Sequence, residues 1–196
     1  MGPSRAIDVR RYGAGGPPVI LIHGGPGARG YMAPMARELS SDFRVLEPLQ
    51  RISGAEPLTV AQHIDDLCEV IASIDGSPPA LVGSSWGAML ALAYAASRPS
   101  SVGPIVLIGC GTFDEPSRSE FRRRLHQQMT ETQRAELAAL ADDPDRDRAL
   151  LRAGDITAPA SSFELLTTDM EFECIDGRGN RETWADMMRL QAEGVY

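Results

Sequence analysis

The sequence predicts an α/β fold: a mostly parallel sheet with helices on both faces, followed by a helical segment. Short apolar runs alternate with stretches of helical period, which is typical of such a sheet. Most of the runs are apolar at every position, as expected for strands buried on both faces. Beyond residue 112 the chain is charged and keeps a helical period, and no further run of this kind is evident.

The N-terminal part alternates strand and helix. Residues 5–12 alternate partly between apolar and polar side chains and predict an edge strand. Residues 17–24 form a continuous apolar run that ends in glycine, and residues 42–48 form a second run, so both predict buried strands. Between them, residues 30–40 predict a helix. Its Pro34 must lie in the first turn, because proline breaks a helix interior.

The alternation continues through the middle of the chain. Residues 57–74 place apolar side chains at helical spacing, and Thr59 is the expected N-cap. Residues 78–85 predict a third buried strand, residues 86–99 a helix of small and apolar residues, and residues 102–111 a fourth strand. Right-handed crossovers between these parallel strands place helices on both faces of the sheet.

The C-terminal part is expected to form a helical cap. We place the core in residues 1–115 and the cap in residues 116–196. The run Arg122 to Arg124 lies among glutamates, which predicts a solvated helix face rather than a basic binding site. The last helix should bury one apolar side, formed by Trp184, Met187, Met188 and Leu190.

Composition and charge narrow the classes of function. The formal net charge of −8 argues against nucleic acid as the main partner, because phosphate binding needs a basic face. The cysteines are widely spaced and odd in number, which predicts neither a disulfide framework nor a metal site. No stretch approaches the roughly 20 apolar residues of a membrane span, and the N-terminus lacks the apolar run of a signal peptide. We therefore expect a cytoplasmic protein that does not bind membranes.

A glycine-rich stretch follows the first buried strand and has two interpretations. Gly25 to Gly30 fit G-x-G-x-x-G, the turn that holds a dinucleotide pyrophosphate, and Glu47 lies about where an acid would bind the ribose. His23 to Gly27, H-G-G-P-G, fit instead a loop that supplies half of an oxyanion hole. Pro26 favours the second interpretation, because it removes a backbone N–H from the turn that would face the pyrophosphate.

A second motif, G-x-S-x-G, lies where a buried strand gives way to a helix, at residues 83–87. In that context Ser85 occupies a tight, strained turn that lifts its hydroxyl clear of the sheet. Gly83 and Gly87 allow the strand and the helix to approach closely. The start of the helix directs N–H groups and a positive dipole end toward developing negative charge. The alternative is a tight turn with an inert serine.

Together the two motifs resemble the α/β-hydrolase superfamily, and most of all its proline iminopeptidase-like branch, where an H-G-G-P-G loop precedes a G-x-S-W-G elbow. The resemblance covers residues 5–115 strongly and the remainder as the start of a helical cap. It implies that Ser85 is the nucleophile and that the N–H groups of Gly25 and Trp86 form the oxyanion hole. The supporting loop and elbow residues are then His23, Gly24, Gly83 and Gly87.

The base and the acid that a serine hydrolase needs are not evident. His23 belongs to the oxyanion loop and is expected to be structural, and His63 is expected to face solvent. Only His126 follows Ser85 in the chain, and its charged helix makes it a weak candidate for the base. Asp114, just after a strand, stands where some members of the superfamily carry their acid.

The resemblance suggests why these groups are missing: the sequence is expected to stop before the two strands that bring them in family members. The sheet should then expose an apolar strand at one edge and self-associate through it. In the cap, Glu171 and Glu173 are expected to form a solvated face, the alternative being ligands of a substrate's α-amino group. Cys110, near the end of a strand, is expected to pack rather than react.

We therefore expect a hydrolase that cleaves an ester or an N-terminal peptide bond through an acyl-enzyme on Ser85. Its substrate would be a small molecule or a short peptide, and it would need no metal or organic cofactor. The 196-residue chain itself is expected to be inactive or impaired. The alternative is a non-catalytic protein of the same fold that binds a small ligand or a partner.

Overall fold

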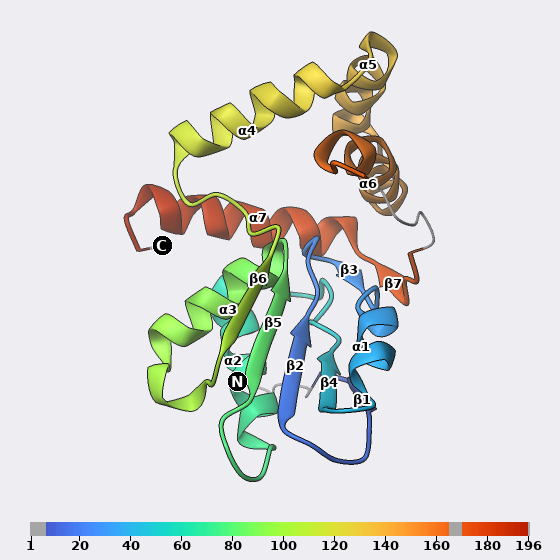
Figure 1. Cartoon of the computed structure of the whole chain (residues 1–196). Helices are drawn as coiled ribbons and strands as arrows, with labels where there is room; N and C mark the ends of the chain where they lie inside the picture. The colour runs from blue at the N-terminus through green and yellow to red at the C-terminus, as the bar shows by residue number, and fades with distance from the viewer. Residues whose placement is uncertain (1–6, 165–169, 196) are drawn as a thin grey trace.

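The computed structural model describes residues 7–164 and 170–195. Within them the main sheet has five strands in the order β1-β4-β2-β5-β6, and all neighbours are parallel except β1 and β4 (Figure 1). The mostly parallel sheet is thus confirmed, with its first strand at an edge. A separate antiparallel pair joins β3 to β7. The strands are β1 (Val9–Tyr12), β2 (Pro18–Ile22), β3 (Ala28–Arg29), β4 (Arg44–Pro48), β5 (Ala80–Ser84), β6 (Ile105–Ile108) and β7 (Cys174–Ile175).

Helices cover both faces of the main sheet, as predicted. One face carries α2 and α3, and the other carries α1 (Figure 1). In β2 the side chains of Ile20 and Ile22 pack on the α2 and α3 side, whereas Val19 and Leu21 pack on the α1 side. This division follows from the alternation of side chains along a strand. The core helices are α1 (Ala33–Leu39), α2 (Val60–Ala72) and α3 (Trp86–Ser97), with a 3₁₀ turn, η1, at Pro99–Ser101.

The predicted helix starts are present. The hydroxyl of Thr59 accepts a hydrogen bond from the N–H of Gln62 at 3.3 Å, and the side chain of Gln62 accepts one from the N–H of Thr59 at 2.8 Å. This capping box satisfies two N–H groups that a helix start leaves unpaired. Pro34 lies in the first turn of α1, where its missing N–H costs nothing.

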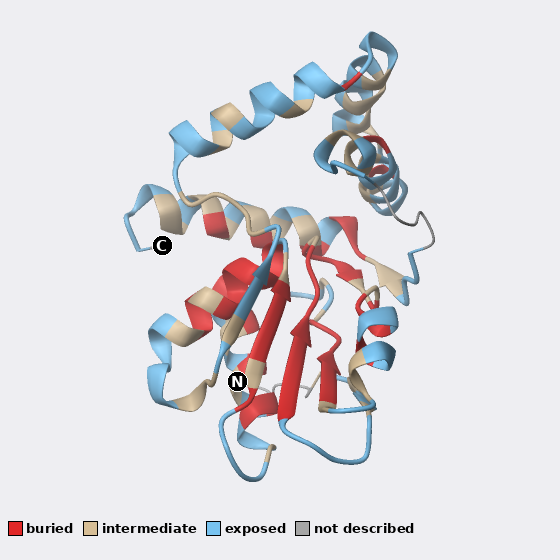
Figure 2. Ribbon diagram, viewed as in Figure 1, coloured by how far each residue is buried: buried red, intermediate tan, exposed pale blue. Residues whose placement is uncertain are grey.

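The chain beyond the core is helical, as predicted. Neither α4 nor α5 contains a buried residue (Figure 2). By contrast, α7 lies across the carboxyl ends of the strands and buries Met187 in the core cluster (Figure 1). Its predicted apolar side is confirmed, because Trp184, Met188 and Leu190 pack on the same cluster. The helices are α4 (Glu115–Gln128), α5 (Glu131–Ala139), α6 (Arg146–Ser161) and α7 (Gly177–Ala192), with a 3₁₀ turn, η2, at Leu140–Asp142.

The sheet has an exposed apolar edge at β6, also as predicted. Val106, Leu107 and Ile108 are 48%, 42% and 38% exposed, and Figure 2 shows β6 as an exposed strip beside the buried β5. Because β6 ends the strand order, its outer row of backbone groups faces no further strand among the described residues. Such an edge is a template for pairing with another chain.

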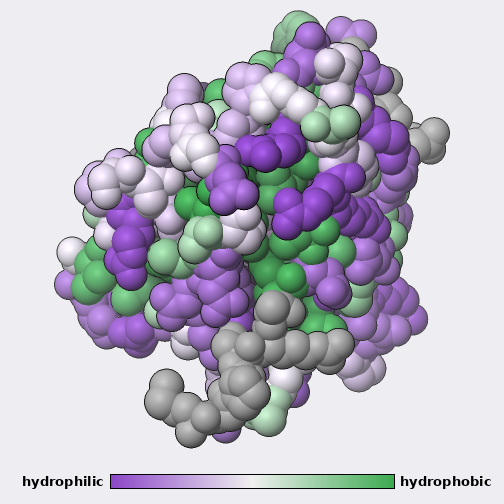
Figure 3. Space-filling model, turned by 90° about the horizontal axis from the view of Figure 1, so that it is seen from below, coloured by the Kyte–Doolittle hydropathy of each residue, from purple (hydrophilic) through white to green (hydrophobic). Residues whose placement is uncertain are grey.

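The rest of the surface is mixed in character. The end of the molecule opposite α7 has hydrophilic residues around much of its border and hydrophobic residues nearer its middle (Figure 3). No helix in the described part of the chain has the length and apolar character needed to cross a bilayer. The cap and α7 lie at the other end of the molecule, where the parallel strands finish and where the candidate site is found.

We predict that the chain self-associates through β6 and that Leu107→Lys weakens this association. A charge on an edge strand opposes pairing with a second strand, and Leu107 is already exposed, so the fold should tolerate the change. Sedimentation velocity at a series of concentrations measures the effect. Phe121→Lys, which places the same charge at an exposed apolar residue of α4, is the control. Equal association of the two variants would contradict a role for the edge.

Candidate active site

The serine of the G-x-S-x-G motif lies in a strained turn between β5 and α3. Ser85 has φ 54° and ψ −117°, and within the described residues no other non-glycine residue has a positive φ. Such a conformation costs energy and persists only where its surroundings enforce it. The N–H of Ser85 donates to the carbonyl of Ile108 at 2.8 Å, which ties the turn to the neighbouring strand. Ser85 is exposed although Trp86 after it is buried, so the turn presents the serine above the sheet.

The glycines near Ser85 are required by close backbone contacts. A Cβ on Gly87 would lie 2.1 Å from the carbonyl oxygen of Ile22, and a Cβ on Gly83 would lie 2.3 Å from that of Gly87. A Cβ on Gly24 would lie 2.8 Å from the Cβ of Ser85. No side chain fits at these separations. Strand β5, helix α3 and the loop after β2 therefore meet through bare backbone.

The two predicted oxyanion donors, the N–H groups of Gly25 and Trp86, are unpaired within the described part of the chain. Trp86 is the first residue of α3, so its N–H has no acceptor within the helix. Gly25 lies in the loop after β2 with φ 87° and lines the same cavity as Ser85. Among the described residues, neither N–H group donates a hydrogen bond. Unpaired N–H groups beside a serine hydroxyl, with the positive end of a helix dipole, are suited to stabilise an oxyanion.

A buried hydrogen-bond network supports the loop and the elbow. The N–H of Gln50 donates to Nε2 of His23 at 3.2 Å, so the imidazole proton lies on Nδ1, which donates to the carbonyl of Gly24 at 3.0 Å. The side-chain amide of Gln50 donates to the carbonyl of His23 at 2.7 Å and accepts from the indole N–H of Trp86 at 2.9 Å. Burial lowers the pKa of His23 to about 4, so this ring is neutral at pH 7 and acts as a structural element.

Helix α7 holds the oxyanion loop from the other side. The side-chain amide of Asn180 donates to the carbonyls of Gly25 and Pro26, the second at 2.8 Å. The N–H of Asp176, the N-cap of α7, donates to the carbonyl of Gly27 at 2.8 Å. These bonds fix the carbonyls of three successive loop residues and anchor the loop to the start of α7.

A largely apolar cavity of about 690 Å³ opens over Ser85. One side belongs to the core and the other to α6 and the stretch that leads into β7. Its volume and lining are in the range of sites that bind small molecules. Its apolar lining includes Ala28, Tyr31, Leu150, Met170, Phe172 and Ile175.

His63 is buried, so the expectation that it faces solvent is wrong. It is 2% exposed, its Nε2 lies 3.1 Å from the hydroxyl of Thr183, and its ring packs edge-on against Trp86 at 5.8 Å between ring centres. Helix α7 covers the side of α2 that the local sequence marks as polar. Burial lowers the pKa of His63 to about 3 and keeps the ring neutral.

The structure does not bring the candidate base and acid to Ser85. Within the described residues no histidine lines the cavity, and His126 is exposed in the last turn of α4. The carboxylate of Asp114 caps α4 by accepting from the N–H and the hydroxyl of Ser117, both at 2.8 Å. These hydrogen bonds lower the pKa of Asp114. Asp114 is thus a helix cap, and it is absent from the cavity lining.

Glu171 and Glu173 do not line the cavity. Met170 and Phe172 line it, whereas Glu171 and Glu173 between and beyond them form ion pairs with arginines of the core. The pairing lowers the pKa of Glu171. The carboxylates are therefore engaged on the core surface instead of facing a substrate's amino group. The partners are Arg37 for Glu171, and Arg10 at 2.6 Å and Arg29 at 3.4 Å for Glu173.

The nucleotide interpretation of the glycines finds no support. The motif contains β3 instead of leading directly into a helix, and α1 begins only at Ala33. The start of α7 does contact the turn, but it binds the carbonyl of Gly27. Glu47 is fully buried, accepts a hydrogen bond from Tyr12 at 2.9 Å and lies 3.6 Å from Arg10, so it is not available to a ribose.

Cys110 packs on the core, as expected, and burial raises its pKa. Across the described ranges, no group of three acidic, histidine or cysteine residues is placed to hold a metal ion.

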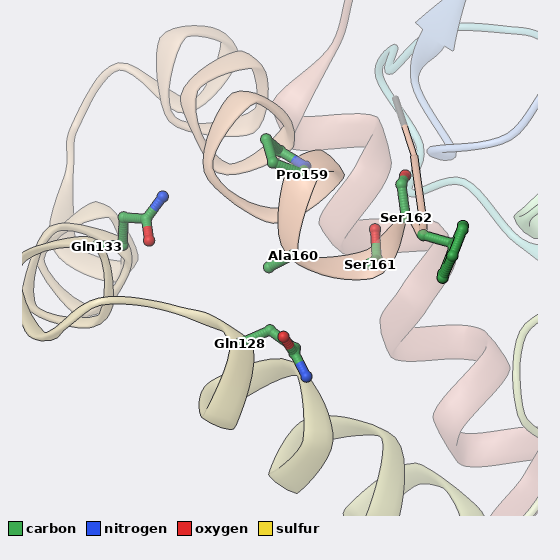
Figure 4. A pocket seen from close by; sticks show the side chains of 7 residues that line it. Gln128, Gln133, Pro159, Ala160, Ser161 and Ser162 are labelled. Carbon is green, nitrogen blue, oxygen red and sulfur yellow. The ribbon is translucent and has the colours of Figure 1, made fainter. Parts of the chain in front are cut away.

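A second hollow, of about 400 Å³, lies between α4, α5 and the end of α6 (Figure 4). Gln128 and Gln133 border it on one side, and Pro159, Ala160 and Ser161 on the other. Pro159 and Ser161 also line the cavity over Ser85, so the last turn of α6 separates the two spaces. The lining of this hollow includes no acidic residue, histidine or cysteine, and we assign no chemistry to it.

Comparison with known proteins identifies the family. A sequence model of the alpha/beta hydrolase family matches residues 19–192, and the chain belongs to this family. Proline iminopeptidase of Neisseria meningitidis serogroup A is 35% identical over 101 residues, which cover 48% of this chain and 33% of that protein. The enzyme of the same name from Heyndrickxia coagulans is 28% identical over 99 residues, covering 47% and 34%. The chain thus aligns to about a third of the length of these relatives.

Solved structures share the fold over nearly the whole chain. A structure from a study of carboxylesterases of Nitrososphaera gargenis superposes with a TM-score of 0.61 at 19% identity, covering 99% of this chain and 74% of that one. An esterase from Thermogutta terrifontis gives 0.57 at 20% identity, covering 92% and 66%. At these identities the likeness establishes the fold alone.

Several residues of the site were not predicted from the sequence. Gln50 could have been identified, because it is a polar residue two positions beyond the end of a buried strand. Such positions lie at the carboxyl edge of a parallel sheet, where ligands bind. Tyr31, whose hydroxyl accepts from the N–H of Gly24 at 2.7 Å, has no such signal. Asp176 and Asn180 contact the loop from far along the chain, and only tertiary structure reveals them.

We predict that Gly87→Ala destabilises the protein by about 1–3 kcal/mol or more, the typical cost of overpacking. The new methyl group would have to lie 2.1 Å from the carbonyl oxygen of Ile22, and backbone must shift to avoid it. Urea unfolding measures the change. Gly154→Ala is the control, because a Cβ there meets nothing within 4 Å and alanine favours the helix. A Gly87→Ala protein as stable as Gly154→Ala would refute the close contact.

We predict that His63 makes the protein less stable as the pH falls below 6.5. The folded ring stays neutral down to about pH 3, whereas the unfolded chain binds a proton near the ordinary pKa of 6.5. The unfolded state then binds more protons, so the free energy of unfolding should fall by about 2 kcal/mol from pH 7 to pH 5 on account of this residue. In His63→Leu this part of the decrease should disappear in urea unfolding at the two pH values. His126→Gln, at an exposed site, should keep it.

Proposed function

We propose that this protein is a serine hydrolase whose Ser85 attacks the acyl carbon of an ester. The supporting observation is a strained, exposed serine at the start of α3, open to an apolar cavity and flanked by unpaired N–H groups. Oγ gives its proton to a base as it attacks, and the oxyanion of the tetrahedral intermediate accepts hydrogen bonds from the N–H groups of Gly25 and Trp86. The ester C–O bond then breaks, the protonated base gives its proton to the leaving alkoxide, and water hydrolyses the acyl-enzyme to release the acid and restore the serine. One such donor typically contributes about 2.7–4 kcal/mol to lowering the barrier.

The cavity favours an uncharged, apolar acyl group. Its lining is largely aliphatic and aromatic, and the two charged residues in it, Arg152 and Asp155, carry opposite charges 3.9 Å apart. The carboxylates of Glu171 and Glu173 are paired with arginines on the core surface. A substrate's α-amino group would find no free carboxylate in Glu171 or Glu173. An N-terminal peptide bond is the second candidate substrate, supported by the similarity to the proline iminopeptidases.

Activity of the 196-residue chain is proposed to be impaired, because no described histidine reaches the cavity to accept the proton of Ser85. The same observation supports a second candidate function, a non-catalytic protein that binds an apolar small molecule over Ser85. The two functions differ in whether the hydroxyl of Ser85 reacts when a base is supplied.

We predict that a fluorophosphonate labels Ser85 slowly and that added imidazole accelerates the labelling. Imidazole is small enough to enter the cavity and take the proton as Oγ attacks phosphorus and fluoride leaves. Intact mass spectrometry follows the adduct. Ser85→Ala should not label, whereas Ser161→Ala, at another serine that lines the cavity, should label like the wild type. A folded chain that stays unlabelled even with imidazole would favour the ligand-binding alternative.

A further inference from the structure

We propose that Gln50 is a positioning residue that sets the separation of the two oxyanion donors, an inference that rests on the proposed function. Gln50 follows β4 and is 5% exposed. It does not line the cavity, so it has no direct contact with a substrate bound there. Its effect would be exerted through His23 and Trp86, the two residues to which it is bonded.

Gln50 joins the loop after β2 to the elbow after β5, two segments that are not connected by strand pairing. The ladder between β2 and β5 ends with the pair Ile22 and Gly83. Beyond it the chain continues into the loop that carries Gly25 on one side and into the elbow that carries Trp86 on the other. Just beyond the end of the ladder, the side chain of Gln50 links the two segments. It donates to the carbonyl of His23 at 2.7 Å and accepts from the indole N–H of Trp86 at 2.9 Å.

The bonds of Gln50 fix orientation as well as distance. Its N–H donates to Nε2 of His23 at 3.2 Å, which sets the tautomer that donates from Nδ1 to the carbonyl of Gly24. That carbonyl belongs to the same peptide group as the N–H of Gly25. On the other side, the side-chain oxygen of Gln50 accepts from the indole N–H of Trp86, the residue whose backbone N–H is the second donor. Gln50 therefore contacts both segments: its backbone N–H and side-chain amide bind His23, and its side-chain oxygen binds Trp86.

The chemistry of Gln50 also argues for positioning rather than simple packing. Burying an amide costs free energy unless its polar atoms are bonded, and both polar atoms of the Gln50 side chain are bonded, one to each segment. A site of this kind must hold its groups within about 0.5 Å of the productive geometry. An amide that donates to one segment and accepts from the other supplies that constraint.

The test compares Gln50→Met and Gln50→Glu with the wild type in imidazole-assisted fluorophosphonate labelling of the full chain. Methionine keeps the length of the side chain and removes both hydrogen bonds. We expect kinact to fall about 10- to 100-fold, the effect of a misplaced group, and KI to change little. Protonated glutamic acid keeps a donor and an acceptor, so the rate of Gln50→Glu relative to the wild type should recover at low pH and fall as the carboxyl ionises.

Tyr94→Phe is the matched control. It removes a partly buried hydrogen bond of 2.8 Å to Ser101 near the far end of α3, so it should lower Tm without changing kinact. A crystal structure of Gln50→Met gives a readout that does not depend on reactivity. The separation of the N atoms of Gly25 and Trp86 should change by more than about 0.5 Å.

Two outcomes would overturn the proposal. The first is a kinact of Gln50→Met within about twofold of the wild type, because a misplaced group should lower kinact much more than that. The second is an unchanged separation of the N atoms of Gly25 and Trp86. If the wild type itself does not label with imidazole, the proposed function fails. The crystallographic separation then decides the role of Gln50 on its own.

Discussion

The rest of the structure depends on one close contact, in which the backbone at the start of α3 touches the backbone at the ends of β2 and β5. Because Gly87 lies against the carbonyl of Ile22, the helix begins directly over the sheet, and the single residue between strand and helix must take a positive φ. That residue is Ser85. Apolar packing on both faces of the sheet holds the contact closed, so the stability of the core maintains the strain at the elbow.

Polar bonds from distant parts of the chain complete what this contact begins. Gln50 reaches the elbow and the loop from the end of β4, and Asn180 reaches the loop from α7. Each comes from a different element, and each is bonded to the carbonyl edge of the oxyanion loop. The sheet thus sets the position of the loop, and these side chains set its orientation. Helix α7 is itself held in place, because it packs on the core cluster through Met187.

The features that follow from local physics could be predicted from the sequence. Apolar runs marked the parallel strands, Thr59 marked the start of α2, and the spacing of Gly83 and Gly87 marked the elbow. His63 was misjudged because it contacts Thr183 of α7, which lies about 120 residues later in the chain. The origin of a catalytic base could not be predicted for a simpler reason: no histidine among the described residues reaches Ser85.

The stretch from Met170 to Glu173 links the cavity to the ionic strength of the solution. Its apolar side chains form a wall of the cavity, while its carboxylates are attached to arginines of the core through partly exposed ion pairs. Attraction between exposed charges is screened by dissolved salt, over about 10 Å at 0.1 M, whereas the apolar contacts on the inner side are not. Added salt therefore loosens the outer attachment of this segment and leaves its inner apolar contacts intact, so the hold on one wall of the cavity depends on electrolyte.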